Sequence, residues 1–262
     1  MQVNRMSSPY KLKKSLGQHF LHDEKVCQQI VDAIRSTPFQ RLLEVGPGGG
    51  ALTKYLLQIP DIDFKAVEID REKVAFLKKT YPAIQDKLIE ESILDMNPPF
   101  EETFTMAGNF PYNISSQIVF KILDWHPQVE AMVGMFQKEV AMRLAAGPGS
   151  KVYGVTSVLT QAFFDVKYLF DVRPESFTPP PKVMSGVIRL LPRKENNPTP
   201  EMRSPRHFKL LVKTAFNQRR KQLRNALKPL FPADVLQDEL FTKRAEQLSV
   251  ADFAALTYKM NG

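Results

Sequence analysis

Short apolar runs alternate with amphipathic stretches along the first two thirds of the chain. The apolar runs, which are typical of buried strands, lie at residues 42–46, 64–69, 88–89, 104–107 and 131–136. Segments with helical spacing begin near residues 51, 71, 115, 138 and 155. Strands that alternate with helices predict a parallel, doubly wound α/β sheet. Two further runs, 166–172 and 186–191, have no clear helix between them, and they favour an antiparallel pair that closes the sheet.

The pattern changes after residue 191. Residues 192–205 contain four prolines and two adjacent asparagines, which is typical of a linker. Three helical stretches follow at about 205–216, 221–230 and 250–260. We therefore expect a sheet-containing domain over residues 1–191, a proline-rich linker over 192–205 and a basic helical domain over 206–262.

Composition narrows the classes of protein that are possible. Cys27 is the only cysteine of the 262 residues, so a disulfide framework is excluded and a cysteine-rich zinc site is not expected. Four scattered histidines do not suggest a metal site either. No apolar run approaches the roughly 20 residues that span a bilayer, and residues 1–14 lack the apolar core of a signal peptide. The sequence therefore predicts a cytoplasmic protein with no metal and no membrane partner.

Positive charge is concentrated in the C-terminal third. The net charge is +8, and residues 203–233 hold nine basic side chains and no acidic one. The cations Lys11, Lys13 and Lys14 also precede any acidic residue. A charge run is usually a solvated helix face. A run of this length without a compensating acid favours contact with a polyanion, first of all a nucleic acid.

A four-residue motif, Asn109-Phe110-Pro111-Tyr112, suggests the handling of a flat ring that carries an amine. It follows the predicted strand at 104–107, which places it at a strand's carboxyl end. The Asn109 oxygen and a nearby backbone carbonyl can accept hydrogen bonds from an exocyclic NH₂, while Tyr112 stacks on the ring. A strand-ending turn whose tyrosine packs locally is the alternative that four residues cannot exclude.

A glycine-rich turn follows the first predicted strand and suggests a nucleotide-containing cofactor. Gly46, Gly48 and Ala51 satisfy the loose dinucleotide fingerprint, and Glu68 lies 20 residues after Gly48, where a carboxylate grips ribose hydroxyls. A nicotinamide cofactor therefore remains possible at this point. Glu44 favours S-adenosylmethionine, because a carboxylate beside the glycines would repel a pyrophosphate but tolerates a sulfonium and an amino group. The 109–112 motif, at the same sheet edge, has no evident use in hydride transfer.

Seven segments taken together carry a family resemblance. They are 13–21 (KKSLGQHFL), 44–50 (EVGPGGG), 109–115 (NFPYNIS), 137–140 (QKEV), 147–151 (GPGSK), 177–183 (FTPPPKV) and 215–221 (AFNQRRK). With these segments the chain resembles the ribosomal RNA adenine N6,N6-dimethyltransferases, specifically the small-subunit enzymes, over nearly its whole length. The resemblance implies a Rossmann-like S-adenosylmethionine-dependent methyltransferase fold with a seven-stranded, mostly parallel sheet and a small all-helical C-terminal domain.

The resemblance also implies an activity. The family dimethylates two adjacent adenosines in the 3′-terminal hairpin loop of small-subunit (16S) ribosomal RNA, using S-adenosylmethionine, during small-subunit biogenesis. We therefore expect a pre-30S particle as the partner and a monomeric enzyme. The cofactor-binding residues that the resemblance implies are His19, Leu21, Glu44, Gly46, Gly48, Glu68, Ser92 and Asn109. Ser92 stands where the family uses an Asp to hold the cofactor adenine, with Glu91 as the alternative, and His19 stands where Asn is more common.

The family's catalytic positions match Asn109, Pro111, Tyr112 and Phe177. The target base is expected to leave its stack and to lie between Tyr112 and Phe177. From the residues alone, core packing beside a proline run is the simpler interpretation of Phe177. The RNA-binding residues that we expect are Lys11, Lys13, Lys14, Arg219, Arg220, Lys221 and Arg224.

Three other functions compete with this one. The large-subunit adenine methyltransferases that confer antibiotic resistance share the glycine turn and an Asn-x-Pro-Tyr/Phe motif, but the segments at 177–183 and 215–221 favour the small-subunit branch. A non-catalytic RNA-binding assembly or transcription factor could retain the fold, and the intact Asn109, Pro111 and Tyr112 argue against lost chemistry. A nicotinamide oxidoreductase comes third, and comparing the binding of S-adenosylmethionine and NAD would separate it.

Overall fold

The computed structural model describes residues 19–261. Two compact units divide the chain: the first comprises the described residues up to Ala141 together with Lys167–Pro192, and the second comprises Met142–Val166 together with the described residues from Arg193 onward. Residues 142–166, which we expected in the sheet-containing domain, therefore group with the C-terminal helices. The assignment of a separate function to each part stays a prediction. The units are described one at a time below.

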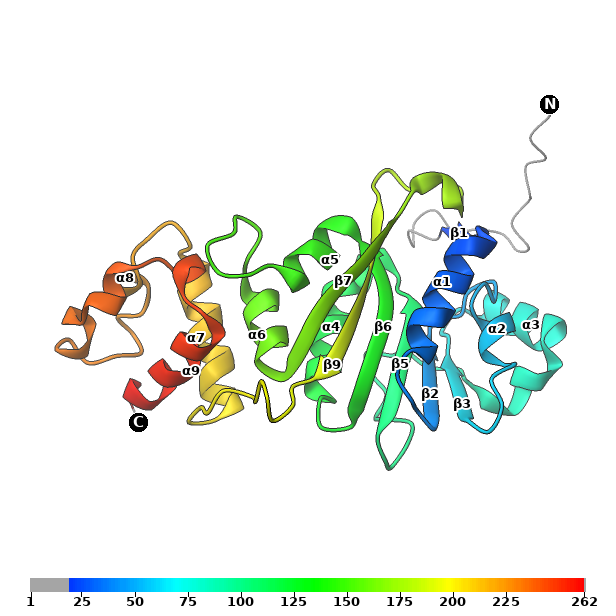
Figure 1. The fold of residues 1–262 in the computed structure, drawn as a ribbon, viewed down its shortest axis with the longest axis horizontal. Coiled ribbons are helices and arrows are strands. Elements are labelled where there is room, and N and C mark those ends of the chain that lie inside the picture. The colour runs from blue at the N-terminus through cyan, green and yellow to red at the C-terminus, as the bar shows by residue number, and fades with distance from the viewer. Residues whose placement is uncertain (1–18, 262) are drawn as a thin grey trace. The chain divides into compact units, whose positions relative to one another are not determined.

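The sheet of the first unit confirms the predicted fold class. Within the described residues it has seven strands in the order β4-β3-β2-β5-β6-β9-β7 (Figure 1). The strands are β2 (Arg41–Val45), β3 (Asp63–Val67), β4 (Leu88–Ile89), β5 (Phe104–Asn109), β6 (Val129–Gln137), β7 (Phe164–Val172) and β9 (Ser185–Pro192). The pairs from β4 to β6 are all parallel, and β9 runs antiparallel to β6 and neighbours β7. The carboxyl ends of β2, β3 and β5 therefore meet at one edge.

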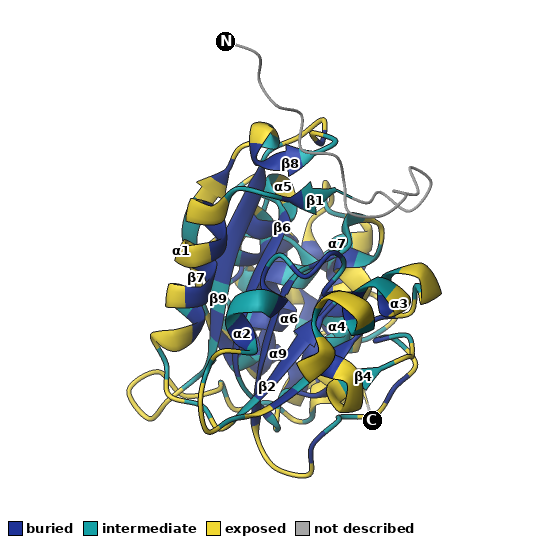
Figure 2. Ribbon diagram, turned by 90° about the vertical axis from the view of Figure 1, so that its right-hand side faces the viewer, coloured by how far each residue is buried: buried dark blue, intermediate teal, exposed yellow. Residues whose placement is uncertain are grey.

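The central strands are buried on both faces, as parallel sheets covered by helices require. β2 and β5 each have one partly buried residue, while their remaining residues are buried. Exposed outer faces and buried inner faces are seen in Figure 2 for α1 (Glu24–Arg35), α3 (Arg71–Thr80) and α4 (Ser115–Asp124). The short α2 (Thr53–Leu56) has only buried and partly buried residues. Asp23 and Asp70 cap α1 and α3 by accepting backbone N–H bonds, so both helices begin at a side-chain cap.

A second sheet of two strands joins the segment before α1 to the segment between β7 and β9. β1 (Phe20–Leu21) pairs antiparallel with β8 (Phe177–Thr178), and Leu21 lies opposite Phe177. Leu21 and Phe177 are each 1% exposed and belong to the same hydrophobic core cluster. This pairing brings the segment before α1 beside the FTPPPKV motif.

The second unit is helical. It contains the second half of α5 (Lys138–Ala145), together with α6 (Val155–Phe163), α7 (Pro205–Asn217), α8 (Leu223–Ala226) and α9 (Val250–Leu256). The predicted helices at 205–216 and 250–260 are confirmed, although the second ends in a 3₁₀ turn. The predicted helix at 221–230 is wrong in length, because α8 is a single turn. Pro229 and Pro232 follow it closely, and residues before a proline disfavour helical geometry.

Several 3₁₀ turns connect these elements. They are η2 (Pro82–Lys87), η3 (Tyr112–Ile114), η4 (Pro174–Ser176), η5 (Val235–Gln237), η6 (Glu239–Thr242), η7 (Ala245–Gln247) and η8 (Thr257–Lys259). Turn η3 begins at Tyr112, so the predicted catalytic motif occupies the junction between β5 and α4. None of the helices in the described part of the chain is long and apolar enough to cross a bilayer.

Candidate active site

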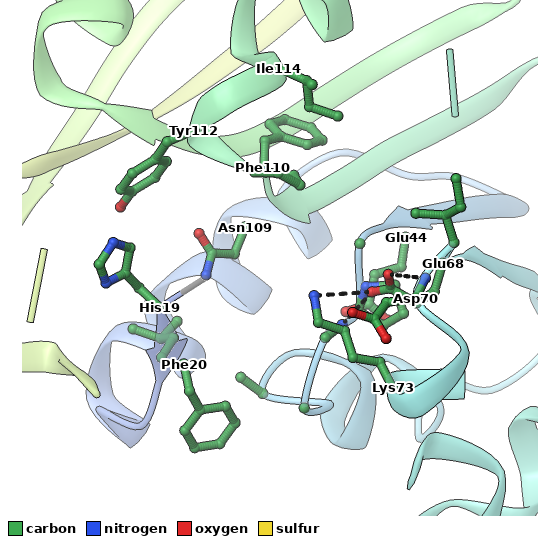
Figure 3. A pocket seen from close by; sticks show the side chains of 18 of the residues that line it. His19, Phe20, Glu44, Glu68, Asp70, Lys73, Asn109, Phe110, Tyr112 and Ile114 are labelled. Carbon is green, nitrogen blue, oxygen red and sulfur yellow. Dashed lines mark hydrogen bonds and ion pairs between the residues drawn. The ribbon is translucent and has the colours of Figure 1, made fainter. Parts of the chain in front are cut away.

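A cavity of about 280 Å³ opens at the carboxyl ends of β2, β3 and β5 (Figure 3). Its walls come from the segment before α1, from the turns after these strands and from the turn after β4. All eight predicted cofactor-binding residues line it, together with two further predicted catalytic residues: His19, Leu21, Glu44, Gly46, Gly48, Glu68, Ser92, Asn109, Pro111 and Tyr112. The structure therefore brings together residues that are up to 93 positions apart in the chain.

The glycine turn requires glycine for its backbone conformation. Gly46 and Gly48 have φ values of +68° and +59°, in the left-handed region that side chains disfavour. A Cβ on Gly46 would meet only ordinary contacts with Pro111, at 3.6 Å, so conformation rather than space selects glycine there. The Gly46 N–H donates to the Val67 carbonyl at 2.9 Å. This bond fixes the turn after β2 against β3 and beside the 109–112 motif.

Glu68 is a buried carboxylate held by two backbone donors and one cation. Its side chain is 5% exposed and accepts backbone hydrogen bonds from Gly48 at 3.3 Å and from Asp70 at 3.0 Å. The Lys73 ammonium lies 3.7 Å from Glu68 Oε2, and Figure 3 shows these interactions converging on the cavity wall. Hydrogen bonds and a cation stabilise an ionised carboxylate, and a fixed carboxylate suits a pair of ribose hydroxyls.

Glu44 is even more deeply buried. It is 2% exposed, and burial raises the pKa of its carboxyl to about 8. A hydrogen bond from Thr53 Oγ1 at 2.7 Å opposes this shift, and the neighbouring charge of Glu68 reinforces it. Glu44 is therefore protonated over much of the neutral pH range in this structure. A cationic group in the cavity would favour its ionised form.

The Asn109 side chain stands at the end of β5. It is half-buried, and no described residue hydrogen-bonds to its amide, which leaves the group available to a ligand. Figure 3 shows it beside His19 and Tyr112. The next residue, Phe110, donates its backbone N–H to the Met135 carbonyl at 3.1 Å, which ties the motif to β6. The amide is thus presented by a rigid strand end.

Tyr112 and His19 form the other wall. Their ring centroids lie 5.7 Å apart with the planes tilted by 33°, and His19 Nδ1 lies 2.7 Å from the Pro179 carbonyl. The Tyr112 hydroxyl hydrogen-bonds to the buried Ser185 at the start of β9. Burial raises the pKa of the Tyr112 phenol. Tyr112 is therefore a neutral, oriented ring at neutral pH, suited to stacking rather than to proton transfer.

Two apolar residues that sequence reasoning missed complete the cavity. Ile69 is 67% exposed although it directly follows the buried Glu68, and it lines the cavity with Leu94. The signal in the sequence that could have identified Ile69 is its place between two acidic residues, Glu68 and Asp70, just after a strand. Such side chains can cover the faces of a planar ring next to a ribose site. Lys73 was also missed, because only the fold brings α3 close to the cavity.

The structure distinguishes between Ser92 and Glu91. Ser92 lines the cavity, and its Oγ accepts a hydrogen bond from the Leu94 N–H at 3.2 Å. Glu91 is exposed and is not part of the cavity wall. Of these two residues only Ser92 therefore lines the cavity, and its role in holding the cofactor adenine stays a prediction.

Phe177 does not lie where we expected it. It is 1% exposed, it packs in the hydrophobic core opposite Leu21, and it is absent from the cavity wall. The β1–β8 pairing turns its ring inward, which matches the core-packing alternative. Its stacking on a target base is not supported by this arrangement and stays a prediction.

The predicted RNA-binding residues fall into three groups. Lys11, Lys13 and Lys14 lie outside the described residues. Arg220 and Lys221 are exposed. Arg219 and Arg224 are instead partly withdrawn from solvent. Arg219 donates to the Ser150 carbonyl and faces Glu246 within the helical unit. Arg224 has a buried Nε and lines a small hollow with Lys228 and Phe231. Among the described residues, no cluster of three or more His, Cys, Asp or Glu could hold a metal ion.

Comparison with known proteins places the chain among RNA-modifying enzymes. The model of the family described as ribosomal RNA adenine dimethylase matches residues 10–260. A protein of Cytophaga hutchinsonii called ribosomal RNA small subunit methyltransferase A is 49% identical over 96% of this chain and 98% of its own length. A Bacteroides fragilis protein of the same name is 51% identical over 94% of this chain and 91% of its own length.

Solved structures agree with this placement. A dimethyladenosine transferase from Plasmodium falciparum superposes with a TM-score of 0.74 at 26% identity, covering 90% of this chain and 94% of that protein. The 23S rRNA methyltransferase ErmE superposes with a TM-score of 0.66 at 26% identity, covering 90% of this chain and 99% of that one. Both proteins are named as methyl-transferring enzymes, so the structural comparison agrees with the family description.

Proposed function

The chain belongs to the ribosomal RNA adenine dimethylase family, and we propose that it dimethylates the N6 amines of two adjacent adenosines in the 3′-terminal hairpin loop of 16S ribosomal RNA. The methyl donor is S-adenosylmethionine, and the substrate is a pre-30S particle in the cytoplasm, on which the enzyme acts as a monomer. One observation carries the proposal: the available Asn109 amide and the oriented Tyr112 ring share a cavity with the carboxylates Glu44 and Glu68.

The residues present fit S-adenosylmethionine. Glu68 accepts hydrogen bonds from the ribose hydroxyls, and Glu44 balances positive charge on the amino-acid portion. Ile69 and Leu94 cover the adenine ring, while the Ser92 hydroxyl bonds to the ring's polar edge. When bound, this cofactor supplies a methyl group activated by a positively charged sulfur. A cavity with buried carboxylates favours such a cation over an anionic pyrophosphate, which separates this function from nicotinamide chemistry.

Asn109 prepares the nucleophile. The lone pair of an adenine amine is delocalised into the ring, so the amine is a poor nucleophile. Hydrogen bonds from its N–H groups to the Asn109 amide oxygen and to a backbone carbonyl favour a pyramidal nitrogen. The Pro111 carbonyl already accepts bonds from Ile114 N–H and Ser115 Oγ, each at 3.3 Å. We therefore assign the second acceptor to the Phe110 carbonyl.

Tyr112 holds the target base in place. Its ring is oriented by the bonds to Ser185 and by the contact with His19, so it offers a fixed stacking surface to a base that has left its own stack. Such positioning supplies much of the acceleration, since alignment at near-attack distance contributes on the order of 7–11 kcal/mol. No strong general base is required, because the amine becomes acidic only after it is methylated and water can then accept the proton.

The small subunit is the better-supported substrate. The two relatives at 49% and 51% identity are small-subunit enzymes by name, whereas the 23S enzyme is 26% identical. The test is to methylate undermethylated small-subunit particles and to map the modified adenosines by reverse transcription, which stops where two methyl groups block base pairing. The proposal predicts stops at two adjacent adenosines in the 3′-terminal hairpin loop. Stops elsewhere in 16S ribosomal RNA, or none after methyl transfer, would contradict it.

A further inference from the structure

Lys73, in the first turn of α3, is the only lysine or arginine among the described residues that line the cofactor cavity. Its side chain is 12% exposed, whereas Lys79 of the same helix is exposed. Lysine is rarely withdrawn from water in this way unless its charge is paired. Figure 3 shows the Lys73 ammonium directed at Glu68. The cavity therefore holds a largely buried cation to which the proposed function assigns no contact with the cofactor.

The pairing of Lys73 with Glu68 is looser than a hydrogen bond. Nζ lies 3.7 Å from Oε2, whereas N–H···O bonds between charged groups span about 2.7 to 2.9 Å. The hydrogen bonds that Glu68 accepts come from the backbone N–H groups of Gly48 and Asp70. Within residues 19–261, no group accepts a hydrogen bond from the Lys73 ammonium. Donors of Lys73 and lone pairs of Glu68 are therefore left for a group in the cavity.

A hydroxyl group placed between these two side chains satisfies both of them. Its O–H donates to Glu68 Oε2, and its oxygen accepts from the Lys73 ammonium. Two atoms that are 3.7 Å apart can share one oxygen at about 2.8 Å from each. A carbonyl oxygen or an ammonium group can pair with only one of the two side chains. The loose ion pair therefore favours a hydroxyl.

The same pair leaves a separate place for positive charge on the ligand. Lys73 offsets the charge of Glu68, so these two side chains together carry none. Glu44 has no such partner, because its hydrogen bond within the described residues comes from the neutral Thr53 hydroxyl. A cationic group of the cofactor is therefore drawn to Glu44, while uncharged hydroxyls are drawn to Lys73 and Glu68.

We propose that Lys73 is a cofactor-binding residue, which donates a hydrogen bond to the oxygen of a ribose hydroxyl whose own proton is donated to Glu68. Lys73 and Glu68 then form one hydroxyl-binding site, which selects a cofactor with ribose over one with deoxyribose. The inference rests on the proposed function, because it adds a residue to the site of that cofactor. It differs from an indirect role in which Lys73 only stabilises the Glu68 carboxylate and never contacts the ligand.

Calorimetric titration of the full-length protein with three ligands tests this contact. They are S-adenosylhomocysteine, which has the ribose of the methyl donor, and its 2′-deoxy and 3′-deoxy analogues. Lys73→Met removes the ammonium, so it is expected to bind S-adenosylhomocysteine about 10- to 100-fold more weakly than the wild type does. Lys79→Met removes an exposed lysine of the same helix and is expected to leave the affinity unchanged.

Comparison of the analogues separates a direct contact from an indirect role. If Lys73 bonds to a hydroxyl, removing that hydroxyl should cost about three- to tenfold less affinity in Lys73→Met than in the wild type. The other deoxy analogue should lose the same factor in both proteins. If Lys73→Met weakens all three ligands by one factor, Lys73 acts only through Glu68 and the proposal is overturned.

The melting temperatures of the ligand-free proteins show whether each variant is folded. Lys73→Gln gives a second variant in case Lys73→Met does not fold, since glutamine is polar and has a shorter side chain that carries no charge. The same unequal loss among the three ligands is expected of it. An equal loss among the three ligands for Lys73→Gln would overturn the proposal as well.

Methyl transfer by the wild type to undermethylated small-subunit particles separates this inference from the proposed function. If the wild type transfers methyl groups normally while Lys73→Met weakens the three ligands equally, only the contact of Lys73 with the ribose is overturned. If the unequal losses are seen but the wild type transfers no methyl group, the proposed reaction fails and the contact stands.

Discussion

The ring of Phe110 lies directly over Gly134, where a Cβ would come within 2.1 Å of ring atom Cε2. Gly134 is in the middle of β6, and the ring also packs 4.8 Å from that of Phe136. Phe110 stands between Asn109 and Pro111. The absence of a side chain at Gly134 is what makes room for its ring. The core of the sheet and the geometry of the catalytic motif are therefore coupled.

Gly134→Ala is expected to destabilise the protein by about 1–3 kcal/mol, because the added methyl overpacks the site and displaces Phe110. Methyl transfer should fall as well, since Asn109 and Pro111 flank the displaced residue. Chemical denaturation measures the first effect and labelled methyl incorporation the second. Gly147→Ala is the matched control, because a Cβ there meets no atom within 4 Å.

Phe110→Leu provides the reciprocal test. The smaller side chain should cost stability in the wild-type background and recover part of the loss in the Gly134→Ala background. If the two substitutions are additive in chemical denaturation, the ring and the glycine are not coupled in the way described.

Glu44 is expected to make stability depend on pH. Its carboxyl has a pKa of about 8 in the folded protein against an ordinary 4.5, so the folded state binds the proton more tightly. Its contribution to stability is fully present below pH 4.5 and is lost as the pH rises through 8. Glu44→Gln removes this loss, so the melting temperature of the variant relative to wild type should increase between pH 5 and pH 8. If the melting temperatures of the two proteins instead change with pH by the same amount over this range, Glu44 is not a buried, protonated carboxyl.

Tyr112 is expected to act through its ring. Stacking of a base on an aromatic ring contributes roughly 1–3 kcal/mol, so Tyr112→Ala should lower methyl transfer by about 5- to 150-fold. Tyr112→Phe keeps the ring and loses only the bond to Ser185, so it should retain most of the activity. Ser185→Ala removes the same hydrogen bond by changing its other partner, and its activity should equal that of Tyr112→Phe. A large loss for Tyr112→Phe, seen in single-turnover rates, would instead assign chemistry to the hydroxyl.

Ser92 is expected to limit cofactor affinity. A hydrogen bond to a charged acceptor contributes about 1 kcal/mol more than one to a neutral acceptor, so Ser92→Asp should bind S-adenosylmethionine about five- to tenfold more tightly. Asp can also replace the turn-forming bond to the Leu94 N–H. Glu91→Gln should leave affinity unchanged, because Glu91 lies off the cavity wall. Calorimetric titration of the three proteins checks both statements, and a response to Glu91→Gln alone would reverse the assignment.

The local pattern of the chain predicted the features that depend on neighbouring residues. The buried runs that became β2, β3, β5 and β6, and the placement of Asn109 at a strand's carboxyl end, follow from apolar runs that end in turn residues. Parallel strands then bring Glu44, Glu68 and Asn109 to one edge without further information. This is why the convergence of these three side chains on one cavity could be predicted before the structure.

Features that depend on non-local packing could not be predicted in this way. Leu21 lies opposite Phe177 although 156 positions separate them, and only that register shows that Phe177 faces the core. Long-range contacts of the same kind group residues 142–166 with the C-terminal helices. They also include the hydrogen bond from Arg219 to the Ser150 carbonyl. The single turn of α8 could have been anticipated from Pro229, because a helix rarely continues up to a proline.

The most direct test of the proposed reaction is methyl incorporation from labelled S-adenosylmethionine into small- and large-subunit particles from an undermethylated strain, with wild type and Asn109→Ala side by side. The wild type is predicted to place dimethyladenosine in the small subunit alone. Asn109→Ala is predicted to bind the cofactor and to transfer no methyl group, because the amine loses its acceptor. Label in large-subunit RNA would contradict the assigned substrate, and full activity of Asn109→Ala would contradict the assigned chemistry.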